Sequence, residues 1–99
     1  MMQARTDRPD TPVRLDDLRE LIDAVDEALL ELLAERARLV DQVAAVKRGE
    51  EIPMRIQSRE DAIVAGVRKR AEELGLSPDI VEDIFCRILD ESHRRMSGS

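Results

Sequence analysis

Residues 15–47 carry the longest regular pattern in this sequence, and the pattern predicts one long helix. Apolar side chains recur there at alternating steps of three and four positions, which places them on one face of an α-helix. Neither proline nor glycine interrupts the stretch before Gly49. Such a stripe is typical of a helix that packs lengthwise against other helices. Its members are Leu15, Leu18, Ile22, Val25, Leu29, Leu32, Leu39, Val43 and Val46.

One position breaks this pattern, because Arg36 stands where the next apolar residue belongs, between Leu32 and Leu39. A guanidinium on a buried helix face costs free energy unless an anion meets it there. Lys47 follows eleven residues later, and eleven steps of about 100° leave only about 20° of rotation between the two side chains. Two cations on one inner face therefore predict a bound anion.

The rest of the chain predicts two shorter helices. A connector over residues 49–57 contains a proline, which prevents ordinary continuation of the long helix. The second helix is predicted to begin after Ser58 as its N-cap and to stop at Gly75. The third is predicted to open with Ser77 as its N-cap and Pro78 in its first turn.

We therefore predict an all-α domain of three helices, one long and two shorter, over residues 15–96, after a disordered lead-in over residues 1–14. The long helix would measure about 50 Å, whereas a compact chain of 100 residues has a radius of gyration near 13 Å. Two short helices cannot cover so long a stripe. The sequence therefore predicts a two-fold symmetric homodimer, with the long helices of two copies packed together.

Composition argues against several classes of function. A net charge of −6 and a single aromatic residue disfavour a nucleic-acid partner. No apolar run approaches the roughly 20 residues of a membrane helix, and the single Cys86 favours a reducing compartment, so we expect a cytoplasmic protein. One cysteine and one histidine cannot build a metal cluster, and no cofactor motif appears, so we expect neither metal nor cofactor. His93, among charged residues, is predicted to lie on the solvated surface.

Further charged residues can complete an anion site. Arg59 and Glu60 fall in the first turn of the second helix, directly after the connector. Arg19 precedes Arg36 by seventeen residues, which rotates it by about 100° and displaces it by about 25 Å. Arg19 therefore cannot serve the pocket of Arg36 in its own chain, but in an antiparallel dimer it can reach the pocket of the other chain. The alternatives are a solvated Arg19, a surface pair of Arg59 and Glu60, and a Ser92 bonded back to its own helix.

Together these residues resemble the all-α chorismate mutase family, whose members are intertwined helical dimers that convert chorismate to prephenate in aromatic amino acid biosynthesis. The resemblance covers nearly the whole chain, and its specificity comes from the order and spacing of five short motifs. They are Leu18-Arg19-Glu20-Leu21-Ile22-Asp23 (family LRxxID), Leu32-Leu33-Ala34-Glu35-Arg36 (LLxxR), Val46-Lys47, Ile52-Pro53 with Arg59-Glu60 (P…RE), and Ser92.

The resemblance implies a role for each matched residue and no cofactor or metal. Two substrate carboxylates would be bound, one by an arginine of the other chain and one within the chain, while a lysine would donate to the ether oxygen of the breaking bond. A glutamate would accept from the ring hydroxyl, and a serine would line the pocket. Arg19 would bind one carboxylate from the other chain, and Arg36, with help from Arg59, would bind the second carboxylate within the chain. The lysine would be Lys47, the glutamate Glu60 and the serine Ser92.

Two positions depart from the family pattern. Met96 stands where members usually carry a Gln or Glu that hydrogen-bonds the ether oxygen beside the lysine. Ile56 stands where many members carry an Asp near the ring hydroxyl. The segment from Ile56 to Glu60 resembles an actinobacterial subgroup of poor catalysts, which are activated by docking onto the first enzyme of the shikimate pathway. We therefore expect that enzyme as a possible partner of this chain.

Three other functions stay open at this point. On the same fold, the chain could be a mutase acting on 4-amino-4-deoxychorismate or an isochorismate pyruvate lyase, because Met96 and Ile56 lie where substrate preference can change. From a different class, it could be a non-catalytic helical dimer that serves as a regulatory module. A scaffold of that kind would tolerate replacement of Arg36 by leucine, whereas an enzyme would lose its activity.

Overall fold

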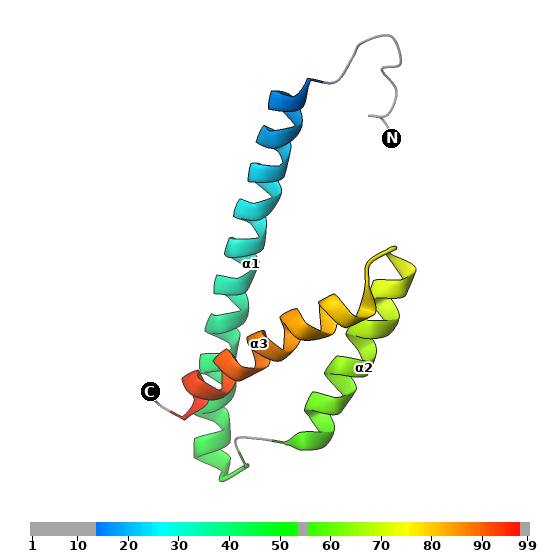
Figure 1. Ribbon diagram of the computed structural model, residues 1–99. Helices are drawn as coiled ribbons and strands as arrows, with labels where there is room; N and C mark the ends of the chain where they lie inside the picture. The colour runs from blue at the N-terminus through cyan, green and yellow to red at the C-terminus, as the bar shows by residue number, and fades with distance from the viewer. Residues whose placement is uncertain (1–13, 54–55, 98–99) are drawn as a thin grey trace. The chain divides into compact units, whose positions relative to one another are not determined.

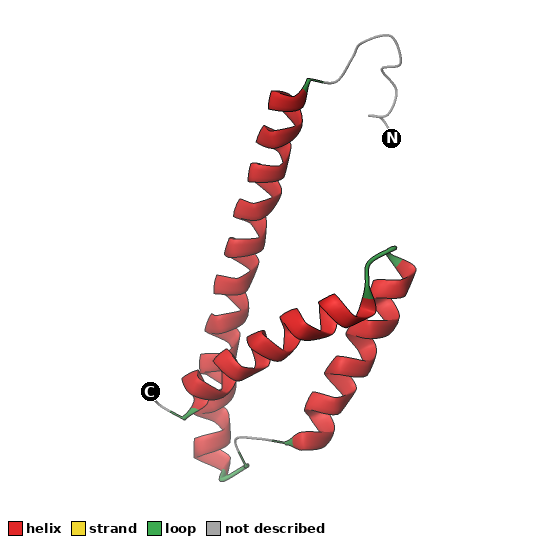
Figure 2. Ribbon diagram, viewed as in Figure 1, coloured by secondary structure: helices red, strands yellow, loops and turns green. Residues whose placement is uncertain are grey.

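The computed structural model describes residues 14–53 and 56–97, and in these ranges the regular secondary structure is all helical, with no strand. The helices are α1 (Leu15–Glu50), α2 (Gln57–Glu73) and α3 (Pro78–Met96), as Figures 1 and 2 show. The predicted all-α class with one long and two shorter helices is therefore confirmed. The predicted lead-in over residues 1–14 lies outside the described residues, except for Arg14.

Two predicted helix boundaries are wrong. α1 continues through Gly49 to Glu50, and the chain leaves the helix at Glu51, whose φ is 58°. A glycine in the last helical turn is tolerated here because the helix ends immediately after it. α2 begins at Gln57 with Ile56 in the N-cap position and no side-chain cap, so Ser58 lies inside the first turn.

The turn between α2 and α3 follows the sequence prediction. Gly75 has a φ of 76°, a left-handed conformation that glycine adopts without steric cost. The N–H of Leu76 donates to the carbonyl of Ala71 at 2.8 Å and that of Gly75 donates to Glu72 at 3.2 Å, which is a Schellman motif. Ser77 Oγ then accepts from the N–H of Ile80 at 3.3 Å and caps α3. Both helices are thus fixed at the point where the chain reverses.

The described chain divides into two compact units, and α1 contributes to both. In the N-terminal unit (residues 1–34) every described residue is exposed, including the apolar stripe of α1. In the C-terminal unit (residues 35–99) the small core consists of Val40, Ala44, Ala71 and Leu89, one or two from each helix. Within the C-terminal unit, α2 and α3 pack closely on each other, and α1 meets α3 through side-chain contacts.

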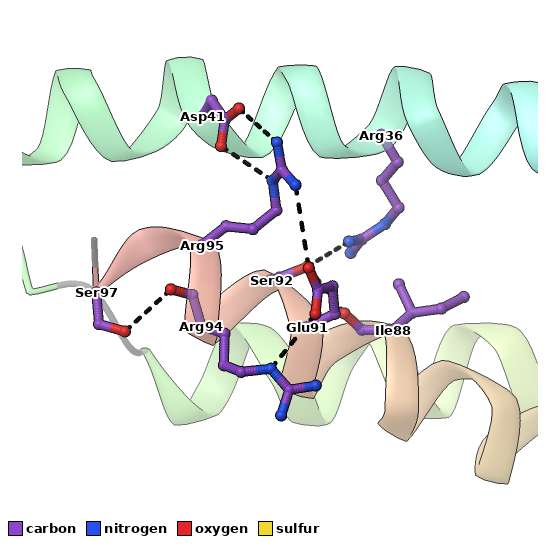
Figure 3. A network of polar contacts seen from close by, with 8 residues as sticks. All are labelled: Arg36, Asp41, Ile88, Glu91, Ser92, Arg94, Arg95 and Ser97. Carbon is purple, nitrogen blue, oxygen red and sulfur yellow. Dashed lines mark hydrogen bonds and ion pairs between the residues drawn. The ribbon is translucent and has the colours of Figure 1, made fainter. Parts of the chain in front are cut away.

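Polar contacts tie the helices of the C-terminal unit together. Arg68 of α2 donates to Glu82 at 2.6 Å and to Asp79 at 3.0 Å, both on α3. Arg95 of α3 donates to both carboxylate oxygens of Asp41 on α1, from Nε at 3.0 Å and from Nη2 at 2.7 Å (Figure 3). The Arg68 contacts join α2 to the N-terminal half of α3, and the Arg95 contacts hold the C-terminal half of α3 against α1.

The Asp41–Arg95 pair predicts how stability depends on pH. The hydrogen bond from Arg95, assisted by its charge, holds the pKa of Asp41 below its ordinary value. A lowered folded-state pKa stabilises the fold above the unfolded pKa of about 3.9, and this contribution disappears as the pH falls through the folded value. Asp41→Asn should therefore lower the free energy of unfolding at pH 7 and have little effect near pH 2. Urea unfolding at several pH values measures this difference.

Asp83→Asn is the matched control, because none of the ion pairs found among the described residues involves this exposed aspartate of α3. An Asp41→Asn effect that stays constant from pH 7 to pH 2 would contradict the assignment of the pair.

Candidate active site

A cavity of about 130 Å³ lies inside the C-terminal unit, where the three helices meet. α1 lines it with the seam on which the sequence places two cations, α2 with its first two turns and α3 with its last two turns. Its lining residues are Arg36, Val40, Val43, Lys47, Ile56, Arg59, Glu60, Ile63, Leu89, Ser92, His93 and Met96. Seven of the eight residues predicted from the sequence to bind substrate are in this set.

Arg36 faces α3 from the seam of α1. Its half-buried guanidinium donates through Nη1 to Ser92 Oγ at 2.6 Å (Figure 3). Ser92 is buried, and its hydroxyl in turn donates to the carbonyl of Ile88 at 3.0 Å. The alternative of a serine bonded back to its own helix is therefore correct, and the same serine also orients the arginine of the cavity.

Lys47 and Arg59 bring two further cations to the cavity. Lys47 is half-buried and lines the cavity together with Arg36, as their spacing along α1 predicts. Arg59 lies in the first turn of α2 and is exposed overall, although it contributes to the lining. Three cationic side chains therefore surround a space that contains a single carboxylate among its lining residues, Glu60. Such a cavity is suited to an anion.

His93 is not the solvated surface residue that the sequence predicts. Its side chain is 22% exposed, it lines the cavity, and its Nε2 contacts Oε2 of Glu60, whose side chain is 12% exposed. The charged neighbours of His93 in the sequence suggest a wet environment, but α3 turns this position toward α2. The spacing along α3 does indicate an inward-facing side chain, because His93 follows the buried Leu89 by four residues and therefore shares its helix face.

Apolar side chains complete the cavity wall. Ile56 and Met96, the two departures from the family pattern, both line it, and neither can donate a hydrogen bond. The carbonyl of Met96 accepts from Nη2 of Arg48 at 3.0 Å, which fastens the end of α3 to α1. Val40, Val43, Ile63 and Leu89 supply the remaining surface. The wall of the cavity thus combines charged and polar side chains with apolar ones.

Arg19 is the one predicted site residue that is not part of this group. It belongs to the N-terminal unit, where it is exposed on α1. Within ranges 14–53 and 56–97, no group of three His, Cys, Asp or Glu side chains is placed to hold a metal ion. The polar groups that line the cavity are therefore cationic side chains, one carboxylate, a hydroxyl and an imidazole.

Comparison with known proteins identifies the family of the chain. The profile of the family described as chorismate mutase type II matches residues 18–97. The chain belongs to the chorismate mutase type II family. This confirms the family assignment drawn from the five sequence motifs.

Chorismate mutase type II relatives include both long and short proteins. The T-protein of Enterobacter agglomerans is 46% identical over 76 residues, which are 77% of this chain and 20% of that protein. The T-protein of Haemophilus influenzae is 40% identical over 79 residues, 80% of this chain and 21% of that protein. A chorismate mutase of Methanocaldococcus jannaschii is 34% identical over 79 residues, which are 80% of each chain. The chain therefore spans about a fifth of the T-proteins and most of the Methanocaldococcus protein.

Among solved structures, none matches the chain significantly. Among the helices described over residues 14–53 and 56–97, none combines the length and the apolar character required to cross a membrane.

Proposed function

We propose that this chain is a chorismate mutase that rearranges chorismate to prephenate. The observation that carries the proposal is the cavity that gathers Arg36, Lys47 and Arg59 around one carboxylate, Glu60. Chorismate is a dianion with two carboxylates, an ether oxygen and a ring hydroxyl. Its rearrangement is unimolecular and needs neither a nucleophile nor a metal, so the available side chains meet its requirements.

The proposed mechanism restrains the substrate and stabilises the charge of the transition state. Arg36, held by Ser92 at 2.6 Å, would bind one carboxylate as a preorganised donor, with Arg59 beside it. Lys47 would donate to the ether oxygen, where negative charge develops as the carbon–oxygen bond breaks. Glu60 would accept from the ring hydroxyl. These contacts together favour the compact conformer in which the reacting carbons approach each other.

The second carboxylate of the substrate needs a cation of its own. We propose that a second copy of the chain supplies it. The apolar stripe of the N-terminal unit supports a homodimer, because its members Leu15, Val25 and Leu32 are each at least 60% exposed in the single chain. Monomers rarely leave an apolar surface of this extent in water. In an intertwined antiparallel dimer, Arg19 of each chain would complete the cavity of the other.

A mixture of two inactive variants tests the shared site. Arg19→Ala and Arg36→Ala chains should each have very low activity alone. In a heterodimer of the two, one site carries both substitutions and the other carries neither. After unfolding and refolding at equal amounts, half of the dimers are mixed, so about a quarter of wild-type activity should return. Activity that stays at the level of the separate variants would contradict a site shared between chains.

Met96 predicts a gain of activity upon substitution. The side chain lines the cavity but offers no donor for the ether oxygen. Met96→Gln would add a second hydrogen bond beside Lys47, and a bond of about 1.5–3 kcal/mol in the transition state corresponds to roughly a ten- to hundredfold higher kcat. Met96→Leu is the matched control of similar volume, and a steady-state assay that finds equal kcat for both variants would contradict this placement of the ether oxygen.

Substrate identity separates the proposal from its rivals. Incubation of the purified chain with chorismate, isochorismate and 4-amino-4-deoxychorismate, with product analysis, should show prephenate from chorismate as the fastest reaction. Faster release of pyruvate from isochorismate would indicate the lyase, and faster reaction of the amino compound would indicate the aminodeoxychorismate mutase. No turnover of any of them would favour the non-catalytic dimer.

We also propose that the first enzyme of the shikimate pathway can act as a partner. Ile56, Ser58, Arg59 and Glu60 support this through their similarity to the subgroup activated in that way. Addition of that enzyme from the same source should raise kcat/KM, and an unchanged rate would remove this proposal without affecting the mutase assignment. The single Cys86 supports a reducing compartment such as the cytoplasm.

A further inference from the structure

The cavity contains a polar pair of which the proposed mechanism uses Glu60 and leaves His93 without a function. His93 of α3 contacts Glu60 of α2 through Nε2 and Oε2, and both side chains line the cavity while most of their surface is shielded from water. A carboxylate accepts hydrogen bonds, so Nε2 of His93 is the donor in this contact, in either the neutral or the charged imidazole. The carboxylate proposed to meet the substrate is therefore held by a neighbouring side chain.

The position of His93 follows from the helix that carries it. Ser92 and His93 are adjacent on α3, and both enter the cavity, where Ser92 orients Arg36 and His93 contacts Glu60. The last turns of α3 thus hold one cation and one carboxylate from two different helices. Because α3 is fastened to α1 by the Asp41–Arg95 pair, this arrangement is anchored close to the cavity.

We propose that His93 is a positioning residue that sets the specificity of the site for a neutral ring hydroxyl over a ring ammonium. This inference rests on the proposed function. A carboxylate offers about four lone-pair sites, so Glu60 can accept from His93 and still accept from a substrate hydroxyl. A hydroxyl needs only one acceptor of modest strength. An ammonium in its place forms a stronger, charge-assisted bond whose strength depends on how much negative charge the carboxylate retains.

Among the positively charged and hydrogen-bonding groups of the cavity, His93 most directly affects how much negative charge the carboxylate of Glu60 retains. α1 contributes Arg36 and Lys47 to the cavity, α2 contributes Arg59, and α3 contributes His93, which contacts the carboxylate directly. Removal of the imidazole takes one donor from the carboxylate and leaves the other cations in place. The site should then accept a cationic ring substituent more readily than it does with His93 present.

The test is the ratio of kcat/KM for chorismate to kcat/KM for 4-amino-4-deoxychorismate. His93→Leu should lower this ratio about tenfold, and His93→Gln, whose amide keeps a donor near the place of Nε2, should restore most of it. The ratio is informative because a loss of folding or packing would reduce both reactions alike. Equal losses on both substrates, or a ratio that His93→Gln leaves as low as His93→Leu, would overturn the inference.

A second measurement tests the contact without turnover. The chain has one histidine, so the imidazole signals in an NMR spectrum report His93 alone. Glu60→Gln should shift these signals, whereas Glu73→Gln, which alters an exposed glutamate paired with Arg70, should leave them in place. Unchanged signals in Glu60→Gln would overturn the positioning role. Wild-type protein that turns over neither substrate would instead overturn the proposed function, and this inference with it.

Discussion

Arg36→Leu should reduce kcat/KM for chorismate by at least about a hundredfold, because a charge-assisted bond to a substrate carboxylate is lost in a shielded site. The free energy of unfolding should not decrease. The substitution replaces a half-buried guanidinium with an apolar side chain on an apolar seam, and such replacements are commonly neutral or stabilising. Ser92 also keeps its bond to the carbonyl of Ile88, so its hydroxyl retains a partner.

Steady-state kinetics and urea unfolding of the same preparation separate these two effects. Arg38→Leu is the matched control, since Arg38 lies two residues away on α1, is exposed, and pairs with Glu35 of its own helix. It should leave kcat/KM within about twofold of wild type. An Arg36→Leu variant that is more stable and fully active would favour the non-catalytic scaffold and contradict the site.

Lys47→Met should lower kcat about 100- to 1,000-fold and change KM much less. The proposed bond from Lys47 strengthens only as negative charge develops on the ether oxygen, so its loss affects the transition state more than the bound substrate. Methionine keeps most of the length of the side chain and removes the charge. The split between kcat and KM therefore distinguishes Lys47 from Arg36, whose bond to a carboxylate exists in the ground state as well.

Lys69→Met provides the control for Lys47→Met, because Lys69 is exposed on α2 and does not line the cavity. Its kcat should stay near the wild-type value. A Lys47→Met variant with unchanged kcat and a raised KM would place the lysine at a carboxylate instead of at the ether oxygen, and the proposed mechanism would then be wrong in this step.

Much of the C-terminal unit could be predicted from the sequence because its signals are local. The periodic stripe defines α1, and Gly75 and Ser77 define the turn between α2 and α3 through a positive φ and a cap. The common face of Arg36 and Lys47 follows from helix geometry alone. These predictions need no knowledge of how the helices cross one another.

The remaining features depend on contacts between helices. The bond from Arg36 to Ser92 joins residues 56 positions apart, and spacing along one helix does not reveal such a meeting. The charged residues next to His93 in the sequence predict an exposed side chain. Its contact with Glu60 forms only when α3 packs on α2. Two helix ends also differ from the sequence prediction, because a glycine stop and a serine cap are weak signals. Gly49 stays helical, and Ile56 rather than Ser58 precedes α2.

A structure of the chain with a stable bicyclic dicarboxylic acid shaped like the transition state would test the central claim most directly. We expect the compound in the cavity lined by Arg36 and Lys47, with one carboxylate on Arg36, the ether oxygen within hydrogen-bonding distance of Lys47 Nζ, and the other carboxylate on Arg19 of a second chain. The compound bound outside this cavity, or bound in it without Lys47 at the ether oxygen, would contradict the account.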